Sequence, residues 1–325
     1  MKHQSDILAL KYRPKDFSDL IGQEYLVDTI QKSIQLNKIP NAYIFTGIRG
    51  VGKTTTARIV AKMLNCTSFD TSNKPDLLNC DQAKAITEDR HPDVIEIDAA
   101  SNTSVENARE IIENVKYNPV LGKYKVYIID EVHMLSKSAF NALLKTLEEP
   151  PPHSKFIFAT TEISKVPITI LSRCQRFDLR RIDKKVLSLF LETIANKENI
   201  LIEKEALNLI VKASDGSVRD ALSILDQANV FKLEDTIKTE EIINMLGYSK
   251  LSDLYNLSKN ILENNLTDLI SKLEDMYQRG SETSKILEDL MNIINWSCKL
   301  KINSNLIKDE FLTEDDKNFA SYVTQ

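Results

Sequence analysis

The sequence predicts an α/β fold, a parallel sheet with helices on both faces, followed by an all-helical region. Short apolar runs typical of buried strands alternate with helix-like segments between residues 42 and 161. After Asp178 this alternation stops, and from Lys184 onward apolar residues recur almost only at helical spacing. A chain of 325 residues is too long for one small core, so we expect one large and one or two smaller domains.

The elements of the predicted sheet follow one another in a regular order. The run AYIFTG begins at residue 42 and ends in glycine, and residues 54–64 continue as a helix. A second apolar run covers residues 93–101, and apolar residues gather on one side of the helix after it. Two more strands are expected at residues 125–133 (KVYIIDEVH) and 155–161 (KFIFATT). Between them lies a helix at residues 136–149, which three prolines end.

The second half of the chain is expected to be helical. Helical spacing of apolar residues marks four segments, at residues 186–200, 203–214, 218–231 and 239–246. Longer and more polar helices follow, and we expect a joint before them at residues 247–250 (GYSK).

The composition excludes several classes of protein. Hydrophobic residues make up 42% of the chain and charged residues 27%, as in ordinary globular proteins. The N-terminus lacks the apolar core of a signal peptide, and no later segment is apolar for long enough to span a membrane. We therefore expect a cytoplasmic protein with no membrane contact. The net charge of −5 argues against a surface that is basic throughout, but not against one local basic face that binds nucleic acid.

Residues 47–54 (GIRGVGKT) match the pattern G-x-x-x-x-G-K-[ST] between a strand and a helix. Glycines in such a turn let backbone N–H groups face a phosphate, and the start of the helix adds partial positive charge. Lys53 is expected to reach the β- and γ-phosphates of a nucleotide, and Thr54 to bind Mg²⁺. An ordinary glycine turn is the weaker alternative. We expect nucleotide contacts from Gly47, Gly50, Val51, Gly52, Lys53, Thr54 and Thr55.

Two acidic residues, Asp130 and Glu131, end the apolar run VYII. Ligands of open α/β sheets bind at the carboxyl ends of the strands. We therefore expect Asp130 to hold Mg²⁺, directly or through water, and Glu131 to orient and deprotonate the attacking water. Without the phosphate-binding motif, a solvated acidic turn would be an equal alternative. His133 is more simply a packed or surface histidine than a catalytic one.

Four further polar residues have two interpretations each. Arg173, in a polar turn, is either an arginine finger supplied to a neighbouring subunit or a surface arginine in a salt bridge. Thr160 and Thr161 end a strand beside the acidic pair, where they either contact the γ-phosphate or water, or simply cap the strand. Arg219 lies in the first turn of a helix, where the dipole does not favour a cation, so it binds either an outside phosphate or a nearby aspartate.

The four cysteines are far apart, and we interpret them as free thiols. Only Cys66 and Cys80 flank a common polar segment, with His91 as a distant third candidate. A structural zinc site needs four ligands at close spacing, so two free thiols are favoured over a metal site. The other two cysteines are Cys174 and Cys298.

Several motifs occur together and in order: KYRPKDFSDLIGQE, GIRGVGKTT, VIEIDAAS, YIIDEVHMLSKSAFNALLKTLEEPPP, ATTE, ITILSRCQRF and GSVRDALSILDQA. In this combination the chain resembles the tau/gamma subunits of bacterial DNA polymerase III, the ATPase motors of the sliding-clamp loader, which are AAA+ ATPases. The resemblance is close from Leu10 to about Gly247. Beyond that, the chain is similar to the helical collar domain of the family only in kind.

The resemblance implies a RecA-like AAA+ domain, a small helical lid and an all-α collar through which five subunits form a ring. We expect these domains at residues 1–181, 182–246 and 247–325, with a collar shorter than that of the family. The implied cofactors are ATP and Mg²⁺. The implied partners are other loader subunits of delta and delta-prime type, the sliding clamp and primer–template DNA. ATP binding would open the clamp, and hydrolysis triggered by DNA would release it. The resemblance also implies that the subunit works within a DNA-directed DNA polymerase, which is a nucleotidyltransferase complex.

The resemblance also implies roles for the ambiguous residues. Thr160 or Thr161 becomes the first sensor of the nucleotide, and Arg219 the second. Arg173, in the SRC motif, becomes the finger that acts on the ATP of the adjacent subunit, which overturns the salt-bridge alternative. The roles given above to the phosphate loop and the acidic pair are unchanged. The edge of the adenine pocket is expected at Tyr12, Arg13 and Pro14.

The chain departs from the family pattern in two places that bind ligands. The family usually carries a four-cysteine zinc module after the first helix, whereas Leu77 and Ala83 stand here where two of the cysteines would fall. We expect a segment that keeps its position but binds zinc poorly or not at all. Family members also often have a basic residue after IDAAS, facing DNA. Here Asn102 and Ser104 would make polar contacts with DNA, and Lys145 is the better candidate to bind a DNA phosphate. The alternative is that Lys145 simply lies on the solvent-exposed face of its helix.

Three other functions fit the sequence less well. A structural loader subunit that does not hydrolyse ATP need not keep the GKT and DE residues. A branch-migration helicase motor fits the SRC motif and residues 141–152 (NALLKTLEEPPP) less well. A metabolic phosphotransferase, which belongs to a different class, would need a small-substrate pocket, and neither the helical C-terminal third nor the finger-like arginine supports one.

Overall fold

The chain divides into two compact units, residues 1–187 with 215–223, and residues 188–214 with 224–325. The computed structural model describes residues 7–68, 76, 77, 79–101, 105–232, 234–246, 251–278, 283–303, 312 and 314–324.

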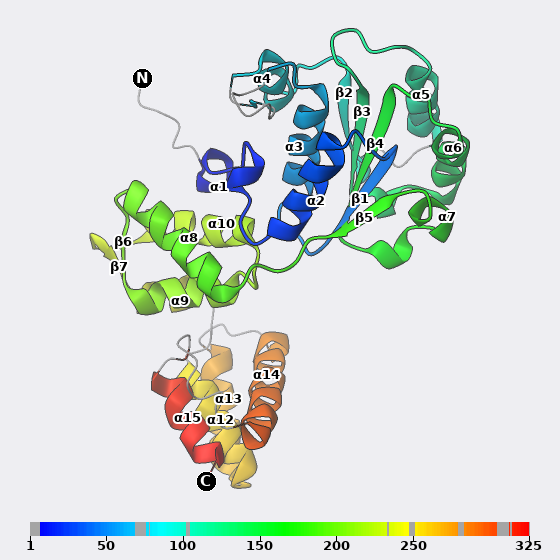
Figure 1. Cartoon of the computed structure of the whole chain (residues 1–325). Helices are drawn as coiled ribbons and strands as arrows, with labels where there is room; N and C mark the ends of the chain where they lie inside the picture. The colour runs from blue at the N-terminus through cyan, green and yellow to red at the C-terminus, as the bar shows by residue number, and fades with distance from the viewer. Residues whose placement is uncertain are drawn as a thin grey trace. The chain divides into compact units, whose positions relative to one another are not determined.

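A five-stranded parallel sheet with the order β2-β3-β4-β1-β5 lies at the centre of the first unit (Figure 1). Its strands are β1 (Ala42–Thr46), β2 (Val94–Asp98), β3 (Lys125–Asp130), β4 (Ser154–Thr160) and β5 (Gln175–Asp178). The parallel sheet predicted from the alternating pattern is confirmed. The sequence pattern does not predict strand β5, because within it Phe177 alone is buried and no apolar run marks it.

Helices cover both faces of this sheet (Figure 1). On one face lie α2 (Glu24–Gln35) and α3 (Lys53–Asn65), and on the other α5 (Val105–Val115), α6 (Lys137–Glu148) and α7 (Ile168–Leu171). The short helices of the unit are α1 (Leu8–Lys11) and α4 (Asp81–Thr87). Its 3-10 turns are Phe17–Asp19, Val132–Met134 and Ile163–Lys165.

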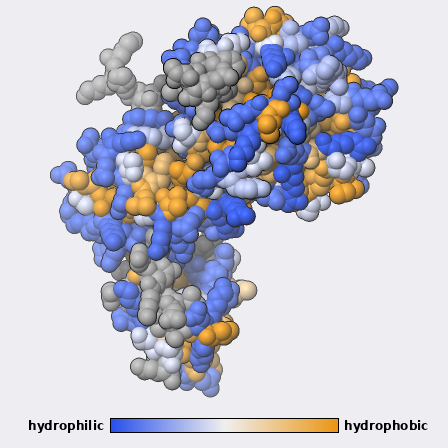
Figure 2. All heavy atoms as spheres, in the orientation of Figure 1, coloured by the Kyte–Doolittle hydropathy of each residue, from blue (hydrophilic) through white to orange (hydrophobic). Residues whose placement is uncertain are grey.

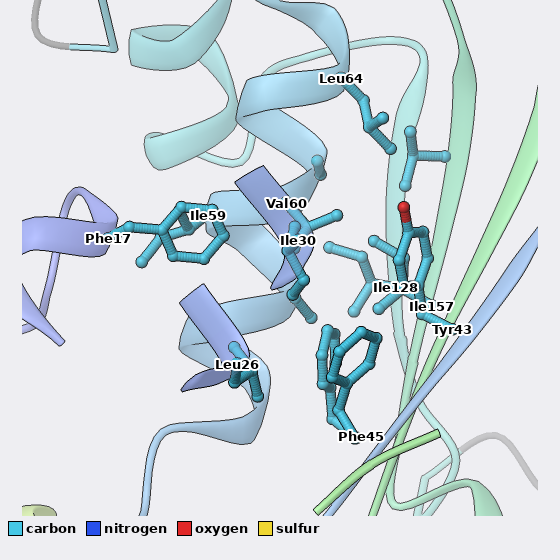
Figure 3. Close-up of a cluster of buried hydrophobic side chains, with 14 of the residues drawn as sticks. Phe17, Leu26, Ile30, Tyr43, Phe45, Ile59, Val60, Leu64, Ile128 and Ile157 are labelled. Atoms are coloured by element: carbon cyan, nitrogen blue, oxygen red, sulfur yellow. The ribbon is translucent and has the colours of Figure 1, made fainter. Parts of the chain in front are cut away.

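Two apolar layers sandwich the sheet. Successive side chains of a strand point to opposite faces, so Tyr43 and Phe45 of β1 pack toward α2 and α3, while Ile44 packs toward α5 and α6. Figure 3 shows the first layer, in which aromatic and branched side chains of the helices and strands meet. Burial on both faces explains why these strands are continuous apolar runs. The two layers fix the carboxyl ends of the strands, where the polar residues lie.

The rest of the chain is almost entirely helical, as predicted. The helices are α8 (Lys184–Lys197), α9 (Lys204–Ala213), α10 (Val218–Phe231), α11 (Thr239–Met245), α12 (Leu251–Leu262), α13 (Leu266–Gln278), α14 (Thr283–Ile302) and α15 (Glu314–Thr324). The parallel strands β6 (Leu201–Ile202) and β7 (Thr236–Ile237) were not predicted, because two residues are too short to show a period. Among the described helices, none combines the length and the apolar character that crossing a membrane requires.

The last four helices share an apolar core of their own. Aromatic rings form its centre, where the rings of Tyr255 and Phe319 stack with centroids 4.3 Å apart. Leu257, from α12, is fully buried beside them. These contacts make α12, α13, α14 and α15 a packed bundle.

Candidate nucleotide-binding site

The glycine-rich loop joins β1 to α3 in a conformation that glycine favours. Gly50 and Gly52 have φ angles of 78° and 100°, which other residues rarely adopt. A Cβ atom on Gly50 would also collide with the hydroxyl of Ser217. No side chain caps the start of α3. Because the first N–H groups of a helix lack partners within it, this end of α3 suits an anion.

Lys53, the first residue of α3, lies over the loop. Its side chain is only 5% exposed, and its Nζ donates hydrogen bonds to the carbonyl oxygens of Gly47 (3.0 Å) and Ile48 (2.9 Å). Burial lowers the pKa of the Lys53 ammonium, and the nearby carboxylates of Glu131 and Asp130 oppose this shift. The loop therefore holds a cation against its own carbonyl groups.

Thr54 and Asp130 form a ready pair of oxygen ligands. The Thr54 hydroxyl donates to Asp130 Oδ2 at 2.5 Å, and Asp130 Oδ1 accepts the N–H of Glu131 at 2.9 Å. Asp130 ends β3, which lies two strands from β1 in the sheet. A hydroxyl and a carboxylate at this edge are the protein ligands that Mg²⁺ takes in nucleotide sites, so the donor set fits the ion.

Glu131 is held by the end of the neighbouring strand β4. Its backbone is left-handed (φ 46°, ψ 45°), and its Oε2 accepts hydrogen bonds from the N–H (3.1 Å) and the hydroxyl (3.0 Å) of Thr161. Thr160 is fully buried, and its hydroxyl oxygen accepts the N–H of Glu162 at 3.0 Å. Of the two threonines that the sequence left open, Thr161 is the one that contacts Glu131, and we keep it as the predicted first sensor.

Arg219 and Arg13 approach the loop from distant parts of the sequence. The N–H of Arg219, in the first turn of α10, donates to the carbonyl oxygen of Gly50 at 3.3 Å. Nε of Arg13 donates to the hydroxyl of Thr55 at 3.3 Å. Burial lowers the pKa of Arg13, and the positive charges of Arg58 and Arg219 add to the effect. Tyr12 and Pro14 flank Arg13, so this segment lies beside the first turn of α3.

Arg173 makes its contacts away from this loop. It follows α7 and precedes β5, and its guanidinium donates to the carbonyl oxygen of Thr169 (2.7 Å) and forms an ion pair with Glu148 of α6. The side chain is 31% exposed. Among the described residues, its hydrogen bonds reach only Thr169, Ser172 and Glu148. The finger assigned to Arg173 therefore stays a prediction that involves another subunit.

Of the three residues predicted to contact DNA, the structure describes only Lys145. Lys145 is exposed on α6, where a phosphate could reach it. Asn102 and Ser104 lie outside the described residues, so their predicted contacts stay predictions.

The segment where the family carries zinc does not fit the metal here. Its four ligand positions hold Cys66, Leu77, Cys80 and Ala83, and all four are part of the apolar cluster of α3 and the sheet. Burial and a hydrogen bond with Cys80 raise the pKa of Cys66 to about 12. Burial alone would raise the pKa of Cys80, but hydrogen bonds with the backbone of Ala83 and with Cys66 lower it to about 7. Within the described residues, no three Cys, His, Asp or Glu side chains are grouped as metal ligands.

His133 is a packed histidine, which is one of the two alternatives that the sequence favours over a catalytic role. The imidazole is only 6% exposed and lies 3.4 Å from Oε2 of Glu131. The spacing of two residues from Glu131 is the signal that could have found it, because a tight turn after a strand returns such a residue to the same edge.

Comparison with protein families assigns almost the whole chain to one assembly. The model of "DNA polymerase III, delta subunit" matches residues 22–183, and that of "DNA polymerase III clamp loader subunit, ATPase lid domain" matches residues 187–231. The model of "DNA polymerase III subunits gamma and tau domain III" matches residues 237–323. The DNA polymerase III subunit gamma of Buchnera aphidicola subsp. Schizaphis graminum is 40% identical over 310 residues, which cover 95% of this chain and 85% of that protein. The chain belongs to the DNA polymerase III tau/gamma family.

Longer members of the tau/gamma family are equally similar. The subunit tau of Salmonella typhimurium is 43% identical over 89% of this chain, and that of Bacillus subtilis is 45% identical over 86%. These matches cover 44% and 49% of the two relatives, so the chain spans less than half the length of each.

Solved structures with a similar fold include RuvB of Thermotoga maritima. The RuvB Holliday junction branch migration motor of Thermotoga maritima has a TM-score of 0.54 at 19% identity, covering 81% of this chain and 85% of that one. This likeness shows a shared fold, which agrees with the α/β domain and the helical region predicted from the sequence.

Proposed function

We propose that this chain is an ATPase motor of the DNA polymerase III clamp loader, which spends ATP to load a sliding clamp onto primer–template DNA. The observation that carries the proposal is the meeting of Lys53, Thr54, Asp130 and Glu131 at one edge of the sheet. Membership of the tau/gamma family supports the choice of substrate and assembly. Because bacterial chromosomes are copied in the cytoplasm, the activity belongs there.

Binding of ATP uses the loop and the first turn of α3. The Nζ of Lys53 leaves the carbonyl oxygens of Gly47 and Ile48 and donates to the β- and γ-phosphates instead. Thr54 and Asp130, which share a hydrogen bond, would hold Mg²⁺ through their oxygens, and the ion would neutralise charge on the phosphates. Arg219 and Arg13 border the loop, and we assign Arg219 to the phosphates and residues 12–14 to the adenine side.

Hydrolysis needs a base and a positive charge at the γ-phosphate. Glu131 takes the proton of the attacking water, and Thr161 orients its carboxylate. We assign the positive charge to Arg173 of the adjacent subunit. Within its own chain, Arg173 is engaged with Glu148 on another part of the surface.

The helical bundle supports assembly into a ring with delta- and delta-prime-type subunits. Its helices α13 and α14 carry apolar side chains on their outer faces at helical spacing: Leu266, Ile270, Tyr277, Leu287, Met291 and Ile294. Each of these side chains is more than half exposed. Figure 2 shows hydrophobic patches among hydrophilic residues on the surface, and apolar stripes like those of α13 and α14 mark contacts with other proteins. We keep three domains, at residues 1–181, 182–246 and 247–325, with the third forming the collar.

ATP hydrolysis by the chain alone is expected to be weak, because Arg173 is supplied by a neighbour. Adding the partner loader subunits, the sliding clamp and primed DNA should stimulate it strongly. The measurement is steady-state phosphate release under each condition, with Lys53→Ala as the control that loses phosphate binding itself. Full hydrolysis by the lone chain would contradict the shared site, and no stimulation in the complete mixture would contradict a loader ATPase.

We further propose that the segment containing Cys66 and Cys80 folds without zinc, because Leu77 and Ala83 pack where other members of the family have ligands. Metal analysis of the purified protein should find far less than one zinc per chain. A content of about one zinc per chain, the stoichiometry of an intact structural site, would contradict this.

A further inference from the structure

We propose that His133 is a positioning residue for ATP hydrolysis, which together with Thr161 holds the Glu131 carboxylate in its working orientation. This inference rests on the function proposed above, since it assigns a task to the surroundings of the predicted base.

The imidazole of His133 connects three residues of the catalytic edge. Its Nδ1 lies 3.0 Å from the hydroxyl oxygen of Thr160 and 3.4 Å from Oε2 of Glu131. Its Nε2 lies 3.5 Å from Oε1 of Glu162. The side chain is only 6% exposed, so these contacts form largely out of water.

The backbone brings His133 back to this edge. Glu131 ends β3 in a left-handed conformation, and the N–H of Met134 then donates to its carbonyl oxygen at 2.9 Å, which closes a 3-10 turn. A left-handed conformation costs a residue other than glycine about 1–3 kcal/mol and persists only where the surroundings enforce it. Here the turn gives Glu131 and His133 a common partner strand, β4, which ends at Thr160.

The charges around the ring favour a donor role. An ionised carboxylate can only accept hydrogen bonds, so a ring N–H that faces Glu131 or Glu162 can donate to it. Burying a polar ring costs free energy unless hydrogen bonds replace its water. An apolar residue would fill the same corner without that cost, and it would leave Glu131 without its contact to Nδ1.

Thr161 and His133 both contact the same oxygen of Glu131. Thr161 donates two hydrogen bonds to Oε2, and His133 also faces Oε2. Among the described residues these contacts leave Oε1 as the oxygen that can accept a proton from water. The Glu131 side chain is 31% exposed, so water can reach it.

A positioning role makes a definite kinetic prediction. A general base must come within about 2.6–3.2 Å of the water that it deprotonates, and a misplacement of about 1 Å can cost about 10²-fold in rate. Loss of the His133 contact should therefore lower the hydrolysis step by about 10- to 100-fold. It should leave ATP affinity unchanged, because among the described residues the polar contacts of His133 go to Thr160, Glu131 and Glu162.

The experiment measures single-turnover hydrolysis and ATP affinity in the assembled complex. His133→Phe fills the space without the hydrogen bonds and should show the rate loss. His133→Asn can place an amide donor near the position of Nδ1 and should recover most of the rate. The matched control is His153→Phe. His153 directly precedes β4, at the opposite end of the strand from Thr160, and is partly buried with its Nε2 3.0 Å from the carbonyl oxygen of Val115. This control should hydrolyse ATP at the wild-type rate.

A double variant separates positioning from a purely structural role. In the Glu131→Gln background, His133→Phe should cause no further loss, because the residue acts through the carboxylate. An equal loss in both backgrounds, or a loss of ATP affinity, would overturn the proposal. Should His133→Phe fail to fold, Thr161→Val removes a donor to the same oxygen and must show the same non-additivity with Glu131→Gln.

Failure of the proposed function and failure of the His133 role give different results. If Glu131→Gln leaves hydrolysis at the wild-type rate, the proposed role of Glu131 is wrong. If Glu131→Gln abolishes hydrolysis while His133→Phe keeps the wild-type rate, the proposed function stands and the positioning role of His133 is wrong.

Discussion

Arg173→Ala is expected to lower ATP hydrolysis by the assembled complex by roughly 10³-fold or more while ATP affinity stays near the wild-type value. A finger stabilises the charge that develops on the transferring phosphoryl group, and this charge is largest in the transition state. The side chain is partly exposed, and among the described residues only Glu148 and the oxygens of Thr169 and Ser172 hold it, so it can be redirected to a neighbour. Single-turnover hydrolysis and a separate ATP-binding titration measure the two quantities.

The control for Arg173 is Arg176→Ala. Arg176 lies three residues further along and is half exposed in an ion pair with Asp178. Its replacement removes a similar charge from the same surface and should leave hydrolysis unchanged. If Arg173→Ala weakens ATP binding as much as hydrolysis, Arg173 has a structural role and does not act as a finger.

Glu131→Gln is expected to lower hydrolysis by about 10²- to 10⁴-fold, the range of a general base. Glutamine has nearly the same shape, and its carbonyl oxygen can still accept the hydrogen bonds of Thr161, but it cannot take a proton from water. ATP and Mg²⁺ should therefore bind as in the wild type, and the complex should stay in the ATP-bound state. The measurement is the rate of a single turnover, with Glu149→Gln, an exposed residue at the end of α6, as the control. A small rate effect would mean that Glu131 is not the base.

The phosphate loop and the acidic pair could be placed from the sequence because local rules decide them. A glycine-rich turn between a buried strand and a helix brings backbone N–H groups and the helix start together, and Asp130 lies at the carboxyl end of its parallel strand. The same rules correctly predict the parallel sheet, since apolar runs without alternation mark strands buried on both faces.

The features of the site that the sequence does not predict depend on backbone turns and on contacts between distant residues. The position of His133 follows from the left-handed conformation of Glu131, which no pattern of apolar residues announces. The hydrogen bond from Arg219 to Gly50 joins residues that are 169 positions apart in the chain, so the spacing of residues in the sequence cannot predict it. Thr160 is the last residue of β4 and Thr161 follows the strand, so the backbone just beyond β4 decides which of the two contacts Glu131, and no sequence pattern predicts that backbone.

Mixing two inactive variants tests most directly whether the active site is shared. Lys53→Ala copies lack phosphate binding but keep Arg173, and Arg173→Ala copies keep the phosphate loop but lack the finger. In rings that contain both, a Lys53→Ala copy next to an Arg173→Ala copy completes one site. The mixture should therefore hydrolyse ATP well above the mean of the two variants, whereas Arg173→Ala mixed with the double variant Lys53→Ala/Arg173→Ala should not. A mixture that stays at the mean of its two components would contradict the shared site, because Arg173 would then act only within its own chain.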